Sequence, residues 1–144
     1  MSGITFPVLY NDCYGGFSHS IKAVEEYNKR LPAGSTLLDV EDELEYEREE
    51  IRRDDPLMVQ ICKELGAEAS GRFAKIAIKE LPLKFKKHFL IMEHDGLENV
   101  KIDFPGYQLA RIRSILNDES LSSEVKVKMS QDALDEQPER RRDL

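Results

Sequence analysis

The sequence predicts an α+β fold: a single compact domain with an antiparallel β-meander and about three helices packed on one face. Segments with the alternation or short apolar runs of strands lie at 4–10, 73–81, 88–94 and 98–104. Segments with the three- and four-residue apolar spacing of amphipathic helices lie at 19–31, 56–65 and 107–117. The last three strand segments follow one another closely, so we expect them to pair with their neighbours in the chain.

The first strand segment, 4–10, leads through a turn into the first helix. Apolar and other residues alternate along it, and Pro7 lacks the N–H group that a ladder hydrogen bond needs. This predicts an edge position or a bulge for that strand. The helix at 19–31 can be capped by a serine in its first turn, and Pro32 and Gly34 end it.

The helix at 56–65 has the clearest boundaries in the chain. Asp55 is a good N-cap, Pro56 fits the first helical position, and Gly66 supplies a stop. One apolar stripe runs along this helix: Met58, Ile61, Cys62 and Leu65. Since Cys62 lies on that stripe, we interpret it as a packed thiol rather than a nucleophile.

The remaining segments set the expected domain boundaries. Asp95 and Gly96 predict a tight turn between the last two strands. The run 41–50 holds seven acidic residues and one arginine, which is typical of a solvated helix face or a mobile loop. We predict one domain over residues 1–117, followed by a charged, flexible tail over 118–144 that could form one transient helix.

Charge limits the partners that the sequence favours. The 144 residues include 28 acidic and 21 basic ones, a formal net charge of -7, which argues against nucleic-acid binding through bulk charge. The one local basic patch is the connector with Lys84, Lys86 and Lys87, interleaved with Phe85 and Phe89, which could stack bases and meet phosphates. The alternative, which we favour, is a loop whose lysines keep a sheet edge soluble.

No long apolar run or signal peptide is present in the sequence, so we expect no membrane partner and no secretion. Neither CxxC nor HExxH occurs, and Glu93, His94 and Asp95 would alternate between the faces of a strand. We therefore expect no metal and no cofactor. The expected location is a soluble, intracellular one.

The two cysteines, Cys13 and Cys62, are expected to be free thiols in a reducing compartment. A catalytic pair of Cys13 with His19, His88 or His94 is conceivable, because a thiolate needs a base within hydrogen-bond reach. The alternative is that Cys13 is simply buried near the end of its strand. We favour this alternative and expect no catalytic residue.

The stretch YNDCYGGFSHS, residues 10–20, is the main candidate site. Glycines let the backbone approach a ligand closely, and a helix N-terminus presents free N–H groups to an anion. Arginines such as Arg53, Arg72, Arg111 or Arg113 could supply countercharge. The structural alternative, which we favour, has Phe17 in the core, a serine capping the helix and a positive φ at one glycine. The candidate ligand-binding residues are Tyr14, Gly15, Gly16, Ser18, His19 and Ser20.

Three blocks of the sequence resemble a family of small, mostly uncharacterised proteins of bacteriophages and large DNA viruses. The blocks are YNDCYGGFSHSIKAVEEY, RRDDPLMVQICKELGAEASGRFAKIAIKELP and HFLIMEHDGLENV. Their shared motifs are a Tyr/Cys-Gly-Gly-Phe turn, an Arg-x-Asp-Pro helix start, a Glu-Leu-Gly stretch with a following Ala-x-Gly, and an Asp-Gly hairpin. The matching residues are Cys13, Tyr14, Gly15, Gly16 and Phe17; Arg53, Asp55 and Pro56; Glu64, Leu65, Gly66, Ala69 and Gly71; Asp95 and Gly96.

The resemblance covers residues 6–100 and has two departures. This chain reads Gly-Phe-Ser-His-Ser where the family often has Gly-Phe-Gly-Leu-Ser, so the turn has one glycine fewer. The segment from Phe104 onward has no counterpart. The resemblance implies a viral source and a compact α+β domain, and it implies no reaction.

These observations favour a non-enzymatic viral protein, either a minor virion component or a host-interaction factor, that binds a protein partner or associates with itself. Such a protein would be found in the host cytoplasm or in the virion. The alternative is an oligomer that binds a small ligand, a phosphorylated metabolite or nucleotide, at the Gly15-Gly16 turn.

Overall fold

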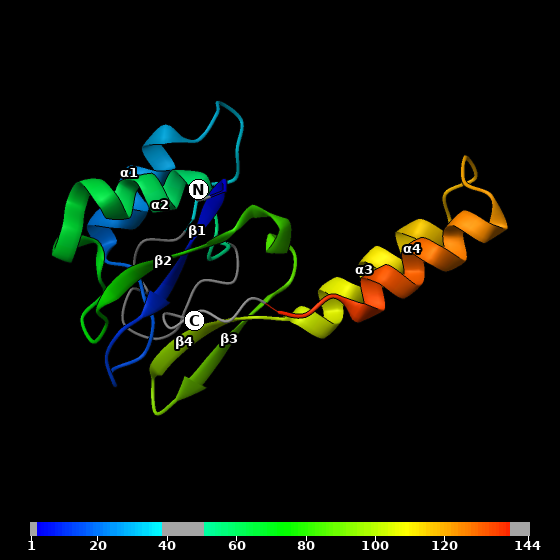
Figure 1. The fold of residues 1–144 in the computed structure, drawn as a ribbon. Coiled ribbons are helices and arrows are strands. Elements are labelled where there is room, and N and C mark those ends of the chain that lie inside the picture. The colour runs from blue at the N-terminus through cyan, green and yellow to red at the C-terminus, as the bar shows by residue number, and fades with distance from the viewer. Residues whose placement is uncertain (1–2, 39–50, 139–144) are drawn as a thin grey trace. The chain divides into compact units, whose positions relative to one another are not determined.

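The protein has an α+β fold, as the sequence predicted (Figure 1). The structure, a computed structural model, describes residues 3–38 and 51–138; the acidic run 41–50 lies outside the described residues. Its strands and helices, in chain order, are β1 (Thr5–Asn11), α1 (Ile21–Arg30), α2 (Pro56–Leu65), β2 (Ile76–Pro82), β3 (Phe89–His94), β4 (Leu97–Ile102), α3 (Phe104–Leu116) and α4 (Ser123–Asp135). Two short 3-10 helices, η1 (Gly66–Ala69) and η2 (Leu83–Phe85), follow α2 and β2.

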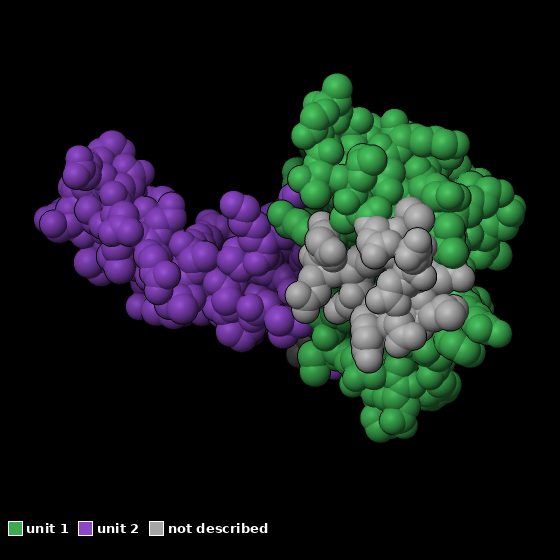
Figure 2. Space-filling view, turned by 180° about the vertical axis from the view of Figure 1, so that it is seen from behind, with its two compact units in different colours: residues 1–83, 91–100 green, residues 84–90, 101–144 purple. Residues whose placement is uncertain are grey.

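Contacts divide the chain into two compact units (Figure 2). Unit 1 comprises residues 1–83 and 91–100, and unit 2 comprises residues 84–90 and 101–144. This grouping differs from the division at residue 117 that the sequence suggested. The difference arises because the segment predicted as a tail contains α4, which packs against α3.

The four strands form two two-stranded antiparallel sheets rather than one continuous meander. β1 pairs with β2 along its whole length, from Thr5 opposite Pro82 to Asn11 opposite Ile76. Pro82 ends β2, and η2 then redirects the chain before β3 begins. β2 therefore pairs with the N-terminal strand β1, and β3 pairs with β4.

The β3–β4 hairpin turns at the predicted Asp-Gly pair. Asp95 has φ 51° and Gly96 has φ 90°. Positive φ at both central residues gives a turn whose twist matches that of the flanking strands, and Asp-Gly adopts it readily. The sequence signal for this hairpin is confirmed.

The helices of unit 1 begin at the caps that the sequence indicated. The Ser20 hydroxyl accepts a hydrogen bond from the Ala23 N–H at the start of α1. Asp55 accepts from the Leu57 and Met58 N–H groups at the start of α2. Each cap satisfies donors that have no partner within the helix.

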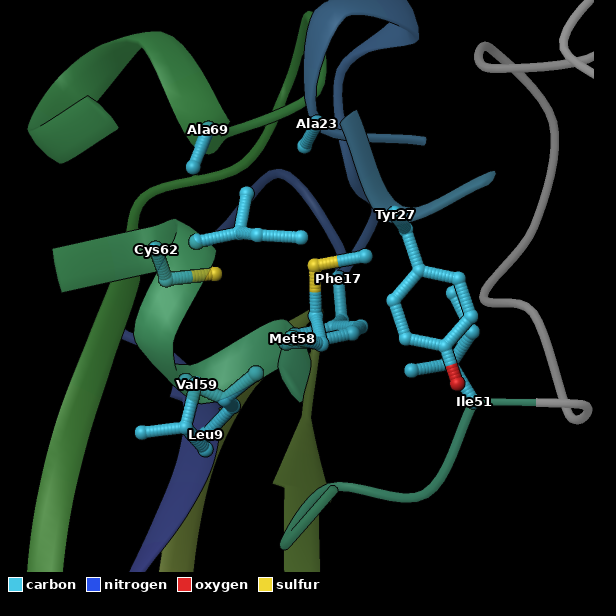
Figure 3. Packing of buried hydrophobic residues seen from close by; sticks show 10 residues of the cluster. Leu9, Phe17, Ala23, Tyr27, Ile51, Met58, Val59, Cys62 and Ala69 are labelled. Atoms are coloured by element: carbon cyan, nitrogen blue, oxygen red, sulfur yellow. The ribbon is translucent and has the colours of Figure 1, made fainter. Parts of the chain in front are cut away.

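The core of unit 1 lies between α1, α2 and β1 (Figure 3). Tyr27 from α1 donates its hydroxyl to Asp55 Oδ2 at 2.5 Å, and its burial together with this bond raises its pKa to about 12. Cys62 lies on the buried side of α2 as predicted, and both cysteines are free thiols. The buried members of the core cluster are Leu9, Phe17, Ala23, Tyr27, Ile51, Met58, Val59, Ile61, Cys62 and Ala69.

Unit 2 is organised around a second, smaller cluster. The Phe85 ring lies 4.8 Å from the Tyr107 ring and 6.3 Å from the Phe104 ring, measured between centroids. Asp103 caps α3 by accepting from the Gly106 N–H at 3.1 Å. The aromatic cluster therefore anchors the start of α3 against η2.

We predict that the two thiols react at very different rates. Burial raises the Cys62 pKa from 9.0 to about 12, while Cys13 is only half-buried. At about pH 8, a thiol reagent should modify Cys13 first and Cys62 only on unfolding, because the thiolate is the reactive form. A Cys13→Ser variant should then show no fast-reacting thiol in the native state. Equal rapid modification of both cysteines would contradict this packing.

The buried Cys62 thiol also makes the free energy of unfolding depend on pH in the alkaline range. The folded-state pKa of Cys62 lies above its ordinary value. Its contribution to the free energy of unfolding is therefore complete below about pH 9 and is lost as the pH rises toward about 12.

Candidate functional site

The Gly15-Gly16 turn is held tightly between two other parts of unit 1. Gly16 has φ 94°, which confirms the expected positive φ. A Cβ atom on Gly15 would lie 1.7 Å from the Phe73 carbonyl oxygen, so no side chain fits there. A Cβ on Gly96 would lie 2.6 Å from both the Gly16 nitrogen and the Tyr14 oxygen. The glycines thus allow the backbones of the turn, the loop around Phe73 and the β-hairpin turn to touch.

Most of the other predicted ligand-binding residues are engaged inside unit 1. Tyr14 is exposed, whereas Ser18 and His19 are buried. The Ser18 carbonyl accepts from the Gly71 N–H at 2.8 Å, and the His19 ring lies edge-on to the Phe17 ring with 5.0 Å between centroids. The structure brings these residues together as a packed turn. Their role in ligand binding stays a prediction.

The N-terminus of α1 is covered by η1. The Ser20 N–H donates to the Ala69 carbonyl at 2.9 Å, and the Ser20 hydroxyl donates to the Glu68 carbonyl at 2.6 Å. The Glu68 carboxylate pairs with Lys22 at 2.8 Å, and this contact lowers its pKa. Two carbonyl oxygens thus contact the N-cap residue of α1 and a carboxylate pairs with Lys22 in its first turn, and these oxygens oppose the binding of a further anion at the candidate site.

Asn11 is a fully buried polar centre that sequence reasoning missed. Its side-chain Nδ2 donates to the carbonyls of Cys13 and Gly96, each at 2.8 Å. Its Oδ1 accepts from the Lys75 N–H at 2.8 Å. The amide therefore joins the end of β1, the turn after it, the start of β2 and the β-hairpin turn. The available signal was an asparagine at a strand end beside a turn, which alone is too common to single out.

A buried ion pair lies beside this amide. Arg53 Nη1 contacts Glu98 Oε1 at 2.7 Å and Nη2 contacts Oε2 at 2.9 Å, so the pair is bidentate. The two side chains are only 12% and 7% exposed. The guanidinium carbon lies 3.6 Å from the centroid of the Phe17 ring, within cation–π range.

The same pair is bonded to the backbone of β1. Glu98 Oε1 also accepts from the Asn11 N–H at 2.8 Å. Arg53 Nη1 donates to the Leu9 carbonyl at 3.3 Å, and the Leu9 N–H donates to the Arg53 carbonyl at 2.7 Å. We call Asn11, Phe17, Arg53 and Glu98 the Arg53–Glu98 centre. The sequence indicated Arg53 as a possible countercharge for a ligand and as part of the Arg-x-Asp-Pro helix start; its partner here is a glutamate of the chain itself.

A cavity of about 410 Å³ opens beside this centre. It is lined by Arg53, Ile91, Glu93 and Glu98. Glu93 Oε2 accepts from the Gly96 N–H at 2.6 Å, and the fork of Arg53 is already occupied by Glu98. The charged groups at this cavity are therefore committed to bonds within the protein.

Cys13 is tied into the turn that follows β1. Its Sγ lies 3.4 Å from Asn11 Oδ1 and 3.3 Å from the Phe73 carbonyl oxygen. It also accepts from the Gly15 N–H at 3.4 Å. These contacts give the thiol a structural role. Within residues 3–38 and 51–138, no three His, Cys, Asp or Glu side chains gather in a way that could hold a metal ion.

The three lysines of the basic connector are exposed, but two of the connector's residues contact other parts of unit 2. Lys84 lies 5.1 Å from the Phe85 ring centroid and 5.7 Å from that of Tyr107, and it pairs with Glu136 at 3.5 Å. Phe85 itself is buried. One of the three lysines and one of the two phenylalanines that were candidate nucleic-acid contacts therefore make contacts within unit 2.

The helices of unit 2 carry a surface that sequence reasoning did not anticipate. α3 and α4 pack side by side, yet several of their large apolar side chains remain exposed to solvent. The sequence predicts a helix at 107–117, which holds Leu109 and Leu116, whereas the apolar residues of α4 fall in the predicted tail at 118–144, where periodicity is weak. The exposed side chains are Leu109, Leu116, Val125, Val127, Met129 and Leu134.

Comparisons with protein-family models, with curated proteins and with solved structures found no match to this chain. Among the helices in the described ranges, none combines the length and apolar character that crossing a membrane requires.

We predict that Gly15→Ala destabilises unit 1. The new Cβ would collide with the Phe73 carbonyl, and the required backbone shift should cost about 1–3 kcal/mol of unfolding free energy. Gly3→Ala is the matched control, because nothing lies within 4 Å of its Cβ position. Urea unfolding of the two variants measures the difference. Equal stability of both would show that the turn is not packed on Phe73.

Breaking the buried ion pair between Arg53 and Glu98 should lower the free energy of unfolding more than Gly15→Ala does. Glu98→Ala leaves the Arg53 guanidinium without its carboxylate, and we expect a loss of about 3–5 kcal/mol. Glu98→Gln should cost less, because the amide oxygen can still accept from Arg53 and from the Asn11 N–H. The exposed Glu124→Ala should change stability by no more than about 0.5 kcal/mol. Chemical unfolding gives the ranking, and a Glu98→Ala variant as stable as Glu124→Ala would refute it.

Proposed function

We propose that the protein acts by binding other proteins and not by catalysis, as a minor virion component or as a host-interaction factor. The observation that carries this proposal is the exposure of four apolar side chains on α3 and α4, a group that does not include Val125. Exposed apolar groups gathered on one element are typical of interaction surfaces. Leu109, Leu116, Val127 and Leu134 are each more than half exposed, although they lie on helices that already have a packing partner.

The state of the chemically capable side chains supports a non-catalytic role. Ser20 caps α1, Cys13 bonds within its turn, and Arg53 is occupied by Glu98 and Phe17. Each of these groups stabilises the fold through contacts that a substrate would have to break. The contacts of these three residues therefore support a structural role for them rather than a catalytic one.

The viral part of the proposal comes from the sequence resemblance over residues 6–100. The segment from Phe104 onward, which has no counterpart in that resemblance, is the segment that forms α3 and α4. The proposed binding surface thus lies in the part of the chain that distinguishes it from the family it resembles. Partner choice is expected to reside there.

The alternative function, capture of a phosphorylated metabolite or nucleotide at the Gly15-Gly16 turn, has weaker support. The Glu68 and Ala69 carbonyls accept hydrogen bonds from Ser20, the N-cap of α1, and the Glu68 carboxylate pairs with Lys22 in the first turn. An anion would have to displace them.

Affinity capture with the tagged full chain tests the proposal. We expect the wild-type protein to retain specific proteins, its own untagged copies included, and the variant Leu109→Glu with Leu134→Glu to retain about tenfold less. Val125→Glu is the matched control, because Val125 is also exposed on α4. Circular dichroism checks that all three proteins are folded.

Mass spectrometry of purified virus particles separates the two versions of the proposal. A virion component is present in particles at a fixed ratio to the other structural proteins, whereas a host-interaction factor is absent from them and is captured with host proteins. Identical capture by wild type, double variant and control, or capture of nothing by any of them, would count against both versions.

A further inference from the structure

Contacts between α3 and α4 fix which side of each helix faces the other. Gln108 Nε2, near the start of α3, donates to the carbonyls of Ala133 at 3.2 Å and Glu136 at 3.1 Å, near the end of α4. Ile115 on α3 and Ala133 on α4 are both buried. The two helices therefore form an antiparallel helical hairpin, as Figure 1 shows. The hydrogen bonds of Gln108 and the burial of Ile115 and Ala133 place these three residues on the sides where the helices meet.

The exposed apolar residues of α3 lie on one side of this helical hairpin. Successive residues turn about 100° around a helix axis, so Leu109 and Leu116 share one side, about a quarter turn from the line through Gln108 and Ile115. Ile112, half-buried, lies between them and the contact with α4. Leu109 is 57% exposed and Leu116 is 52% exposed.

Two exposed apolar residues of α4 lie on the same side. Val127 and Leu134 are seven residues apart, about a quarter turn from the line that contacts α3 through Ala133. Because both helices are right-handed and run in opposite directions, this quarter turn points to the side occupied by Leu109 and Leu116. Val127 is 70% exposed and Leu134 is 57% exposed. We call Leu109, Ile112, Leu116, Val127 and Leu134 the apolar face.

We propose that a second copy of this chain covers the apolar face, so that two helical hairpins close into an antiparallel four-helix bundle. The inference rests on the proposed function, since it names the protein that the surface binds. A two-helix hairpin with one apolar side is half of such a bundle, and a two-fold axis parallel to the helices places α3 of each copy against α4 of the other.

Charge complementarity favours this occupant and this arrangement. α3 carries two arginines, Arg111 and Arg113, and no acidic residue between Phe104 and Leu116. α4 carries three acidic residues, Glu124, Asp132 and Asp135, against two lysines. Arg111 lies on the other side of α3, where it contacts Glu136 of its own chain at 3.6 Å. Arg113 flanks the apolar face on α3 and Glu124 flanks it on α4, so pairing α3 with the α4 of a second copy brings these opposite charges to the same edge, whereas pairing α3 with α3 would oppose like charges.

Light scattering and sedimentation equilibrium on the purified full chain test this inference. At about 100 µM we expect a mass near twice 16.6 kDa for the wild-type protein. The double variant Leu109→Glu with Leu134→Glu should raise the dissociation constant of the dimer about 100-fold, because it places like charges on a face that must be desolvated. Val125→Glu, on the opposite side of α4, should leave the dissociation constant within about threefold of wild type.

Two outcomes overturn the inference. A wild-type chain that stays monomeric at about 100 µM shows that no second copy covers the face. A dimer that Val125→Glu weakens as much as the double variant shows that another surface pairs. If the purified chain is monomeric while affinity capture yields a different protein that only the double variant loses, the proposed function stands and self-association through this face is excluded.

Discussion

The bidentate contact between Arg53 and Glu98 is the interaction on which the rest of unit 1 depends. Arg53 precedes α2 and Glu98 lies on β4, so the pair connects the helical part of the unit with the β-hairpin. Both partners also bond the backbone of β1. Burying two charges is costly unless their remaining hydrogen-bonding groups also find partners. Here the backbone of β1 bonds both Glu98 and Arg53, and the Phe17 ring contacts the guanidinium. The ion pair therefore attaches the β-hairpin to β1 and to the start of α2, and it fixes the position of the hairpin relative to them.

Asn11 and the glycines complete this polar contact region by allowing close backbone approach. Asn11 bonds both the Gly96 and the Cys13 carbonyls, while Gly15 and Gly96 leave no room for side chains at the points of contact. The apolar cluster of unit 1 joins β1 to α1 and α2, and it does not extend to the β-hairpin turn. The hairpin is held instead by hydrogen bonds whose directions leave little freedom, which explains why small residues and one amide occupy these positions.

Local signals in the sequence predicted local structure well. Ser20 and Asp55 cap helices, and Asp95 with Gly96 turns a hairpin, because each acts on neighbours within a few residues. The pairing of β1 with β2 and the contact of Arg53 with Glu98 join residues far apart in the chain, and no short-range pattern encodes them. At the candidate site, the sequence singled out residues 14–20 correctly as a special turn, but it could not show that Phe73 and Gly96 fill the space above the glycines.

The weak sequence signal for α4, where the sequence indicated a charged tail that could form one transient helix, has a different cause. Its apolar residues are mostly exposed and do not form the single stripe that a helix buried on one side shows, so its periodicity was weak. Ser122, which accepts from the Val125 N–H, was the available capping signal. A helix that presents apolar groups on two sides is difficult to distinguish from a tail unless its partners are known.

The discontinuity of unit 1 along the chain also bears on how the protein is made. The Asn11 N–H finds its acceptor on Glu98, 87 residues later in the sequence. During synthesis, α1 and α2 can form and pack once residue 65 has left the ribosome, but Arg53 must wait for β4 before its charge is neutralised by a carboxylate. Contacts that close such long loops form late. A nascent chain that ends before residue 98 therefore contains every buried residue of the core cluster, yet it lacks the carboxylate that neutralises Arg53 in the fold.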